Sequence, residues 1–183
     1  MMIERIRREH GYMVRLLAML RRKLVSIKDE QTINYSLIRE IVAYLANHSE
    51  KVHHPKEDIL YRYYIEHYDA NGAMANLEQE HEQLSGKTHD FLDTLDMILA
   101  DAVIPQDVFV AQLEEFLNLQ RNHLDFEEQS ILPQIANSFT TKDWQRVEAL
   151  WSTEESDPVF GDTIADEYLL LADRVRRGER ECV

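Results

Sequence analysis

Apolar residues recur at alternating steps of three and four along most of the chain, and this spacing constrains the fold more than any other feature of the sequence. Residues 2–28 show it most clearly, with apolar side chains at Ile3, Ile6, Met13, Leu17, Leu20, Leu24 and Ile27. The spacing places one apolar face on an α-helix, as in helices that pack in bundles. Only 5 Gly and 4 Pro occur among 183 residues, so the sequence indicates helices almost throughout.

The periodic segments predict four long helices, at about residues 2–28, 34–67, 73–100 and 105–137, with a break at 69–72. Because short connections join antiparallel neighbours, we predict an all-α fold in which residues 1–138 form an antiparallel up-down-up-down four-helix bundle. Residues 139–183 are predicted to form a short C-terminal helical extension, with helices at about 141–151 and 162–177. Pro55 lies inside the second helix and should kink it there.

Each predicted helix carries polar residues at positions where its inward face should be apolar. These residues are His10, His53, Glu57, His81, His123 and Glu127. Their spacing repeats, because a lone histidine precedes a His-x-x-x-Glu pair by 43 residues in the first half and by 42 in the second. Residues four apart lie on one face of a helix, so each such pair can hold a metal ion from one side.

Two further histidines also have an acidic residue four positions later. The face of the helix on which each pair lies therefore has to distinguish predicted ligands from surface pairs. All such pairs in the sequence are His53/Glu57, His54/Asp58, His89/Asp93 and His123/Glu127. His54 is rotated by about 100° from the inward face, and the residues before it on its own face are polar, namely Lys51, Asn47 and Glu40. We therefore predict that the His54 and His89 pairs lie at the surface or in supporting positions beside the ligands.

A metal centre explains the six inward polar residues better than a network of hydrogen bonds among them, because such groups cost several kcal/mol when buried without partners. Two octahedral ions, bridged by two glutamates and by an oxo or hydroxo group, would take four terminal histidines and keep one open position each. Imidazole and carboxylate donors without thiolate suit iron, with manganese or zinc as alternatives. Iron with open positions implies O₂, peroxide or NO chemistry.

A ferritin-like di-iron plan is excluded by the order of the helices. Glu50 and His53, and likewise Glu78 and His81, form Glu-x-x-His runs. In ferritin-like proteins these runs lie on alternate helices. Here they fall on the consecutive second and third helices, while Gln120 stands three residues before His123 on the fourth.

Composition and charge exclude several other classes of protein. The net charge of −14 disfavours contact with phosphate backbones, so we expect no nucleic-acid partner. Cys182 is the single cysteine, which excludes an internal disulfide and favours a reducing compartment. The N-terminal residues form no apolar signal region, and no run of about 18 apolar residues occurs. We therefore expect a cytoplasmic protein that has no membrane partner.

The segments that carry the predicted ligands resemble the hemerythrin-like, histidine-histidine-glutamate cation-binding domains. The resemblance covers about residues 1–138 and rests on REHGYM, VHHPKEDILY, EQEHEQL and RNHLDFEEQSILP, which occur in the family's order. It implies a four-helix bundle with an oxo-bridged di-iron site. In that site His10, His53, His81 and His123 would be terminal ligands, and Glu57 and Glu127 would bridge the two irons.

The resemblance departs from the oxygen-carrying hemerythrins at one point. Those carriers place two histidines four residues apart on the third helix, whereas Leu77 and Ser85 flank His81 here. With four histidines rather than five, the chain is more similar to members linked to repair of iron-sulfur centres, to nitric oxide handling and to iron sensing.

Three functional hypotheses follow. The first is a binding and sensing protein whose partner is a small diatomic molecule, O₂ or NO, since no substrate-binding motif such as a phosphate loop is present. The second is a di-iron enzyme that reduces NO or peroxide, or that donates iron for cluster repair, with Tyr12, Tyr61 and Tyr64 near the ligands. The third keeps the fold with zinc or no metal and acts as an interaction module.

The extension also carries large aromatic residues that need a partner surface. Trp144, Trp151 and Phe160 would cover either the bundle or a second subunit. A homodimer is therefore one of the assemblies that the sequence allows.

Overall fold

The computed structural model describes residues 1–68, 74, 76–151 and 157–181, and every regular element in this part of the chain is helical. The all-α class of the prediction is confirmed. The helices are α1 (Met2–Lys28), α2 (Tyr35–His48), α3 (His54–His67), α4 (Leu77–Leu99), α5 (Gln106–Phe126), α6 (Leu132–Ser138), α7 (Thr141–Leu150) and α8 (Leu169–Glu181). None of these helices is both long and apolar enough to cross a membrane.

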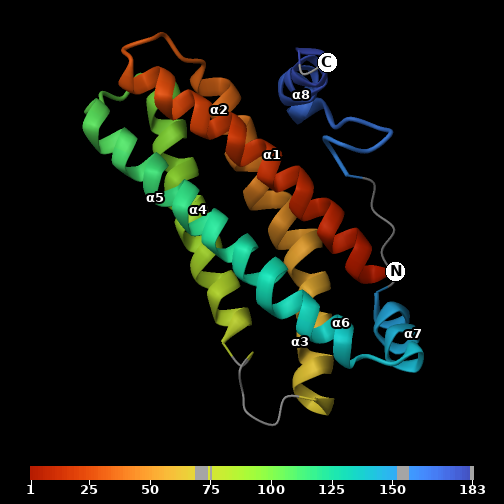
Figure 1. Cartoon of the computed structure of the whole chain (residues 1–183). Helices are drawn as coiled ribbons and strands as arrows, with labels where there is room; N and C mark the ends of the chain where they lie inside the picture. The colour runs from red at the N-terminus through yellow and green to blue at the C-terminus, as the bar shows by residue number, and fades with distance from the viewer. Residues whose placement is uncertain (69–73, 75, 152–156, 182–183) are drawn as a thin grey trace.

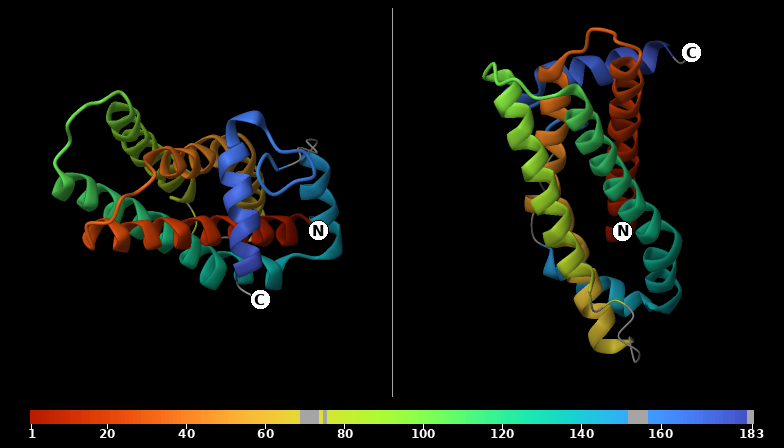
Figure 2. Two further views of the ribbon diagram at one scale, coloured as in Figure 1. Left: turned by 90° about the horizontal axis from the view of Figure 1, so that it is seen from above. Right: turned by 90° about the vertical axis from the view of Figure 1, so that its left-hand side faces the viewer.

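The long helices lie side by side along the length of the molecule (Figure 1). Helix α2 packs against α4, and α1 packs against α5 and α2. Helix α3 continues from the end of α2 in Figure 1, and Figure 2 gives two further views of the same helices. Their apolar faces form two separate clusters of buried side chains, a larger one that includes Leu17 and Ile41 and a smaller one that includes Ile6 and Leu60.

The helix boundaries follow the predictions closely where the apolar pattern is uninterrupted. Helix α1 has the predicted bounds, and α7 ends one residue before the predicted helix at 141–151. The predicted break at 69–72 and the predicted start of the third helix at residue 73 lie outside the described residues. Helix α8 begins at Leu169 rather than near residue 162, because residues 157–168 form turns and a short 3₁₀ helix, Asp166–Tyr168.

A π turn, Ser49–His53, joins α2 to α3 just before Pro55. The N–H of His54 donates to the carbonyl of Ser49, five residues earlier. A proline has no N–H, and its ring would clash in an α-helix with the carbonyl four residues before it. For Pro55 that carbonyl belongs to Lys51, which lies inside the π turn. The wider turn therefore lets the helix continue through the proline that the sequence analysis expected to kink it.

A second π turn, Glu127–Ile131, joins α5 to α6 in the same way. Leu132, which precedes Pro133, donates its N–H to the carbonyl of Glu127. The sequence analysis predicted an uninterrupted helix over 105–137 and did not foresee this turn. Such π turns add one residue to a helix and are frequent at functional sites.

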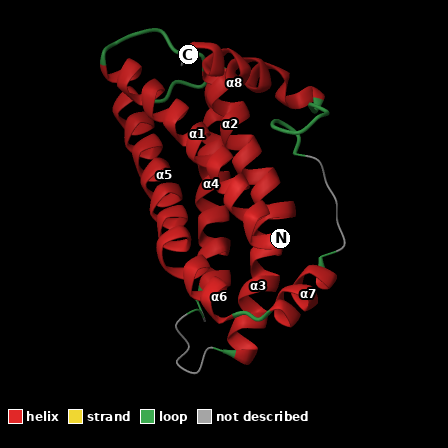
Figure 3. Cartoon of the chain, turned by 45° about the vertical axis from the view of Figure 1, so that its right-hand side comes forward, coloured by secondary structure: helices red, strands yellow, loops and turns green. Residues whose placement is uncertain are grey.

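The C-terminal extension packs against α2 and α3 (Figure 3). Helix α7 is fixed by Asp143, whose carboxylate accepts hydrogen bonds from the hydroxyls of Tyr63 and Tyr68, each at 2.6 Å. Phe160 stacks on Tyr12 of α1 with ring centroids 4.1 Å apart. The bundle provides a partner surface for all three predicted aromatic residues, because Trp144 and Trp151 pack against the smaller apolar cluster.

Candidate metal centre

The six polar residues predicted to face inward meet in one place, between the two apolar clusters. His10 comes from α1, His81 from α4 and His123 from α5, while His53, Glu57 and Glu127 lie in or beside the two π turns. Glu57 and Glu127 are completely buried, with 0% of each side chain exposed. The four histidines and the two glutamates thus converge from four separate helical segments on a common centre.

One group of donor atoms lies on the side of α1 and the first π turn. The Nε2 atoms of His10 and His53 are 3.1 Å apart. Oxygen Oε1 of Glu57 is 3.0 Å from the His10 nitrogen and 3.2 Å from the His53 nitrogen. These three atoms form a cluster that could hold one metal ion.

A second group lies on the side of α4 and α5, and the two glutamates connect it to the first. Oxygen Oε2 of Glu57 is 3.5 Å from His81 Nε2, and Glu127 Oε1 is 3.4 Å from the same nitrogen. Glu127 Oε2 is 3.4 Å from Nε2 of both His123 and His10. Each carboxylate therefore directs its two oxygens to different histidines.

Three atoms of this centre are buried without a hydrogen-bond partner among the described residues, namely Glu57 Oε2, Glu127 Oε2 and His123 Nε2. An unsatisfied buried polar atom costs about 1–3 kcal/mol. All three belong to groups that converge on one point, and nitrogen and oxygen donors of this kind are ligands that divalent metal ions accept. The residues present therefore fit a metal centre.

Carboxylates on the outer side of the centre orient three of the histidines. The Nδ1 atoms of the histidines lie 2.8–3.0 Å from these carboxylates, in the pairs His10 with Glu128, His53 with Glu9, and His81 with Asp58. A partner on Nδ1 turns Nε2 toward the metal side of the ring and makes it a better donor. Sequence analysis expected a supporting position for Asp58 but missed the other two acids, although each adjoins a residue of the centre in the sequence.

Glu9 shows how a buried supporting carboxylate is kept charged. Burial would raise its pKa, but hydrogen bonds and charge from His53 and Lys56 outweigh burial and lower the pKa to about 2. Lys56 is itself buried, with 1% of its side chain exposed. Lys56 therefore helps to keep the carboxylate of Glu9, which contacts Nδ1 of His53, in its charged form.

Of the two positions predicted for His54, the structure excludes the surface and agrees with a supporting position beside the ligands. This residue is buried, with 9% exposed, and its donor atom lies within 4.8 Å of those of Glu57, His81 and His123. The prediction assumed that the regular α-helical geometry of the residues before the π turn continues through it. The extra residue in the turn instead changes the direction in which the side chains after it point. His89, by contrast, is 46% exposed at the surface, as predicted, and contacts Glu50.

The metal-free centre holds protons where a metal would bind. Burial opposes protonation of His10, but hydrogen bonds to Glu128 and Glu57 outweigh it and raise the pKa of His10 to about 10. Asp58 and Glu127 likewise outweigh burial at His81 and raise its pKa to about 10. Burial and the neighbouring His81 hold the pKa of His54 well below its ordinary value.

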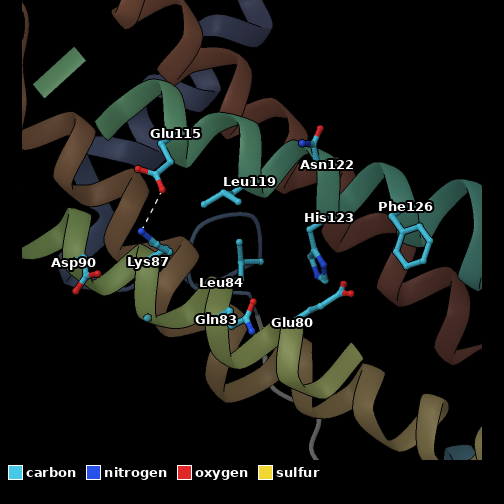
Figure 4. Close-up of a pocket in the computed structure, with 11 residues that line it drawn as sticks. Glu80, Gln83, Leu84, Lys87, Asp90, Glu115, Leu119, Asn122, His123 and Phe126 are labelled. Atoms are coloured by element: carbon cyan, nitrogen blue, oxygen red, sulfur yellow. Dashed lines mark ion pairs between the residues drawn. The ribbon is translucent and has the colours of Figure 1, made fainter. Parts of the chain in front are cut away.

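A groove of about 770 Å³ runs between α4 and α5, and His123 is one of the residues that line it (Figure 4). Lys87 of α4 and Glu115 of α5 form an ion pair across it, with 3.2 Å between nitrogen and oxygen. Leu84 and Leu119 line its middle. Because Nε2 of His123 is buried toward Glu127, the groove meets the outside of this imidazole ring rather than the centre itself.

Comparison with known families agrees with this geometry. The family model for the hemerythrin HHE cation-binding domain matches residues 1–135. No curated protein and no solved structure matches the chain.

The protonated histidines lead to a prediction for the metal-free protein, whose stability should fall as the pH rises from about 7 to 10. His10 and His81 ordinarily titrate near 6.5 but in the fold near 10. Their stabilisation is therefore complete below about 6.5 and lost as the pH rises through 10. Thermal unfolding of chelator-treated protein across this range measures the effect.

The metal-loaded protein is the control for this measurement, because its surface charges are the same and its histidines hold metal in place of protons. The unfolding temperature of the metal-free protein should fall more steeply with pH than that of the loaded protein. Parallel curves would contradict the protonated centre.

The supporting carboxylates lead to a second prediction. Asp58→Ala should weaken metal binding by about 10–100-fold, because His81 loses the partner that orients its ring. Asp93→Ala is the matched control, since Asp93 also follows a histidine by four residues but lies exposed at the surface. Competition with a chelator measures both affinities, and equal affinities in the two variants would refute a supporting role for Asp58.

Proposed function

The chain belongs to the hemerythrin HHE cation-binding domain family, and we propose that it holds two iron ions between its helices and binds O₂ or NO there. In this function it acts in the handling or sensing of oxygen, nitric oxide, iron or redox state. The observation that carries the proposal is the position of Glu57. Its Oε1 lies 3.0 Å from His10 Nε2, and its Oε2 lies 3.5 Å from His81 Nε2.

A carboxylate in this position suits a bridge between two ions. Each of its oxygens faces a different set of histidines, and Glu127 repeats the arrangement, with Oε1 near His81 and Oε2 near His10. One ion could use only one side of these two glutamates. Two ions account for both sides, and they also account for the buried oxygens that have no hydrogen-bond partner among the described residues.

The donor types support iron as the metal. Imidazole and carboxylate without thiolate suit iron, whereas manganese and zinc accept the same donors and are the competing outcomes. Iron bound with an open position supplies an attachment point for O₂ or NO. The chain's own residues supply the orientation of the ligands, through Glu9, Asp58 and Glu128, and the exclusion of water, through the apolar clusters on either side.

The proposal includes an up-down-up-down arrangement of the four helical segments, α1, α2 with α3, α4, and α5 with α6. Packing of α1 on α5 and of α2 on α4 supports it. Such bundles build metal sites from side chains on facing helices.

The proposed function predicts about two irons per chain in protein purified without air. Addition of NO or O₂ to the ferrous protein should then produce new charge-transfer absorption. Glu57→Ala should lose iron and this absorption together, because it removes the group that faces both sets of histidines. Metal analysis and absorption spectra of the two proteins test the prediction.

Glu66→Ala is the matched control, since Glu66 lies on the same helix and is exposed. It should keep both irons and the spectrum. Stoichiometric zinc, or iron-loaded protein that gives no spectral change with either gas, would overturn the proposed function.

A second candidate function, turnover of NO or peroxide, is favoured by one contact. The hydroxyl of Tyr61 donates a hydrogen bond of 2.6 Å to Glu127 Oε1 and is buried. It could supply a proton to a substrate at the centre. Of the other tyrosines considered, Tyr12 stacks on Phe160, and Tyr64 accepts a hydrogen bond from Gln134.

If this second function holds, Tyr61→Phe should slow steady-state consumption of NO or peroxide by about 100-fold or more, the usual effect of losing a general acid. Binding of NO by the ferrous protein should remain. Tyr64→Phe is the control and should turn over at the wild-type rate. Equal rates in all three iron-loaded proteins would remove Tyr61 from the reaction.

A further inference from the structure

Trp151 connects the C-terminal extension to the buried charges beside the metal centre. It follows the last residue of α7, a helix that packs against α3 (Figure 1). The ammonium nitrogen of Lys56, on α3, lies over its indole ring, 5.5 Å from the ring centroid. Trp151 lies beyond residues 1–135, which the family model matches, so the family match assigns it no role.

Lys56 carries this contact to His53 through Glu9. Its Nζ donates a hydrogen bond to Oε1 of Glu9, and the other oxygen of Glu9, Oε2, lies 2.8 Å from Nδ1 of His53. Only 1% of the Lys56 side chain and 9% of the Glu9 side chain are exposed. An indole ring, an ammonium group, a carboxylate and an imidazole therefore form a continuous row from the extension to a predicted ligand.

The ammonium group of Lys56 gains from an aromatic ring because it is buried with few hydrogen-bond acceptors. An ammonium group has three N–H donors, and Glu9 is its one hydrogen-bond acceptor among the described residues. Burial of a cation is costly. The face of an indole ring attracts a cation, most strongly where water is excluded. Trp151 therefore offsets part of the cost of burying Lys56.

Hydrogen bonding does not explain the position of Trp151. Its indole N–H is buried without a hydrogen-bond partner among the described residues, although a buried indole normally finds one. Trp144 packs against the same smaller apolar cluster, but its ring contacts Phe139. The contact with Lys56 is what distinguishes Trp151 from this second tryptophan.

We propose that Trp151 is a positioning residue of the metal centre, on which it acts through Lys56, Glu9 and His53. The inference rests on the proposed metal centre and gives the extension a part in it. While the ring holds Lys56 in place, the buried carboxylate of Glu9 keeps its counter-charge and stays on Nδ1 of His53. Without the ring, water reaches Lys56, and Glu9 loses the partner that holds it in the interior. His53 then loses the carboxylate that orients it as a ligand.

Substitutions at residue 151 separate this role from the packing of the extension. Trp151→Ala removes the ring, whereas Trp151→Phe keeps an aromatic face for Lys56. Trp144→Ala is the matched control, because Trp144 packs against the same cluster without contacting Lys56. Each metal-free protein is titrated with cobalt(II) alone, with a chelator as competitor, and circular dichroism checks that the helices remain.

We expect Trp151→Ala to weaken cobalt binding by about tenfold, the lower end of the range for residues that orient ligands. Trp151→Phe and Trp144→Ala should both bind cobalt like the wild type. Trp151→Ala is also made together with Lys56→Met, which keeps the length of the side chain but removes its charge. The double variant should bind cobalt no more weakly than Lys56→Met alone, because the effect of the ring passes through Lys56.

Wild-type affinity in Trp151→Ala would overturn the inference and leave the proposed function intact. An equal loss in Trp144→Ala, a loss that Trp151→Phe does not restore, or a further loss of the same size in the double variant would overturn it in the same way. If Lys56→Met is not helical, the comparison of the tryptophan variants decides alone. Wild-type protein that binds no cobalt would instead overturn the metal centre and, with it, the role of Trp151.

Discussion

Burial of charge in the middle of the helices is the constraint on which the rest of this structure depends. Two glutamates with no exposed surface lie between two apolar clusters, where an uncompensated carboxylate would be very costly. In the metal-free state, protonated histidines supply part of the compensation. A divalent cation bound there would replace those protons, so metal affinity would depend on pH and metal binding would contribute directly to folding stability.

Much of the fold and most of the centre could be predicted from residues at fixed spacing. Helix α1 was predicted with its observed bounds because its apolar stripe is uninterrupted. His10 and His81 could be recognised as candidate ligands from the sequence, because each stands where the apolar pattern of its helix calls for an apolar residue. Residues 1–135 also match a family model, in agreement with the resemblance.

The parts that sequence analysis missed depend on bonds that no local pattern displays. The first π turn shifts the helix by one residue, so the polar face upstream of Lys51 does not predict where His54 points. Pro55 and Pro133 were the available signals, since each follows a π turn. Glu9 and Glu128 act on histidines of other helices, and only tertiary packing reveals such pairs.

The groove between α4 and α5 makes His123 a shared residue, with one side of its ring in the groove and Nε2 turned to Glu127. A molecule or side chain that enters the groove and tilts this ring would change the affinity of the centre for its metal. Thermodynamic reciprocity then requires the metal to change the affinity of the groove for its occupant by the same factor. The His123 ring would then couple the centre to the groove on the outside of the bundle.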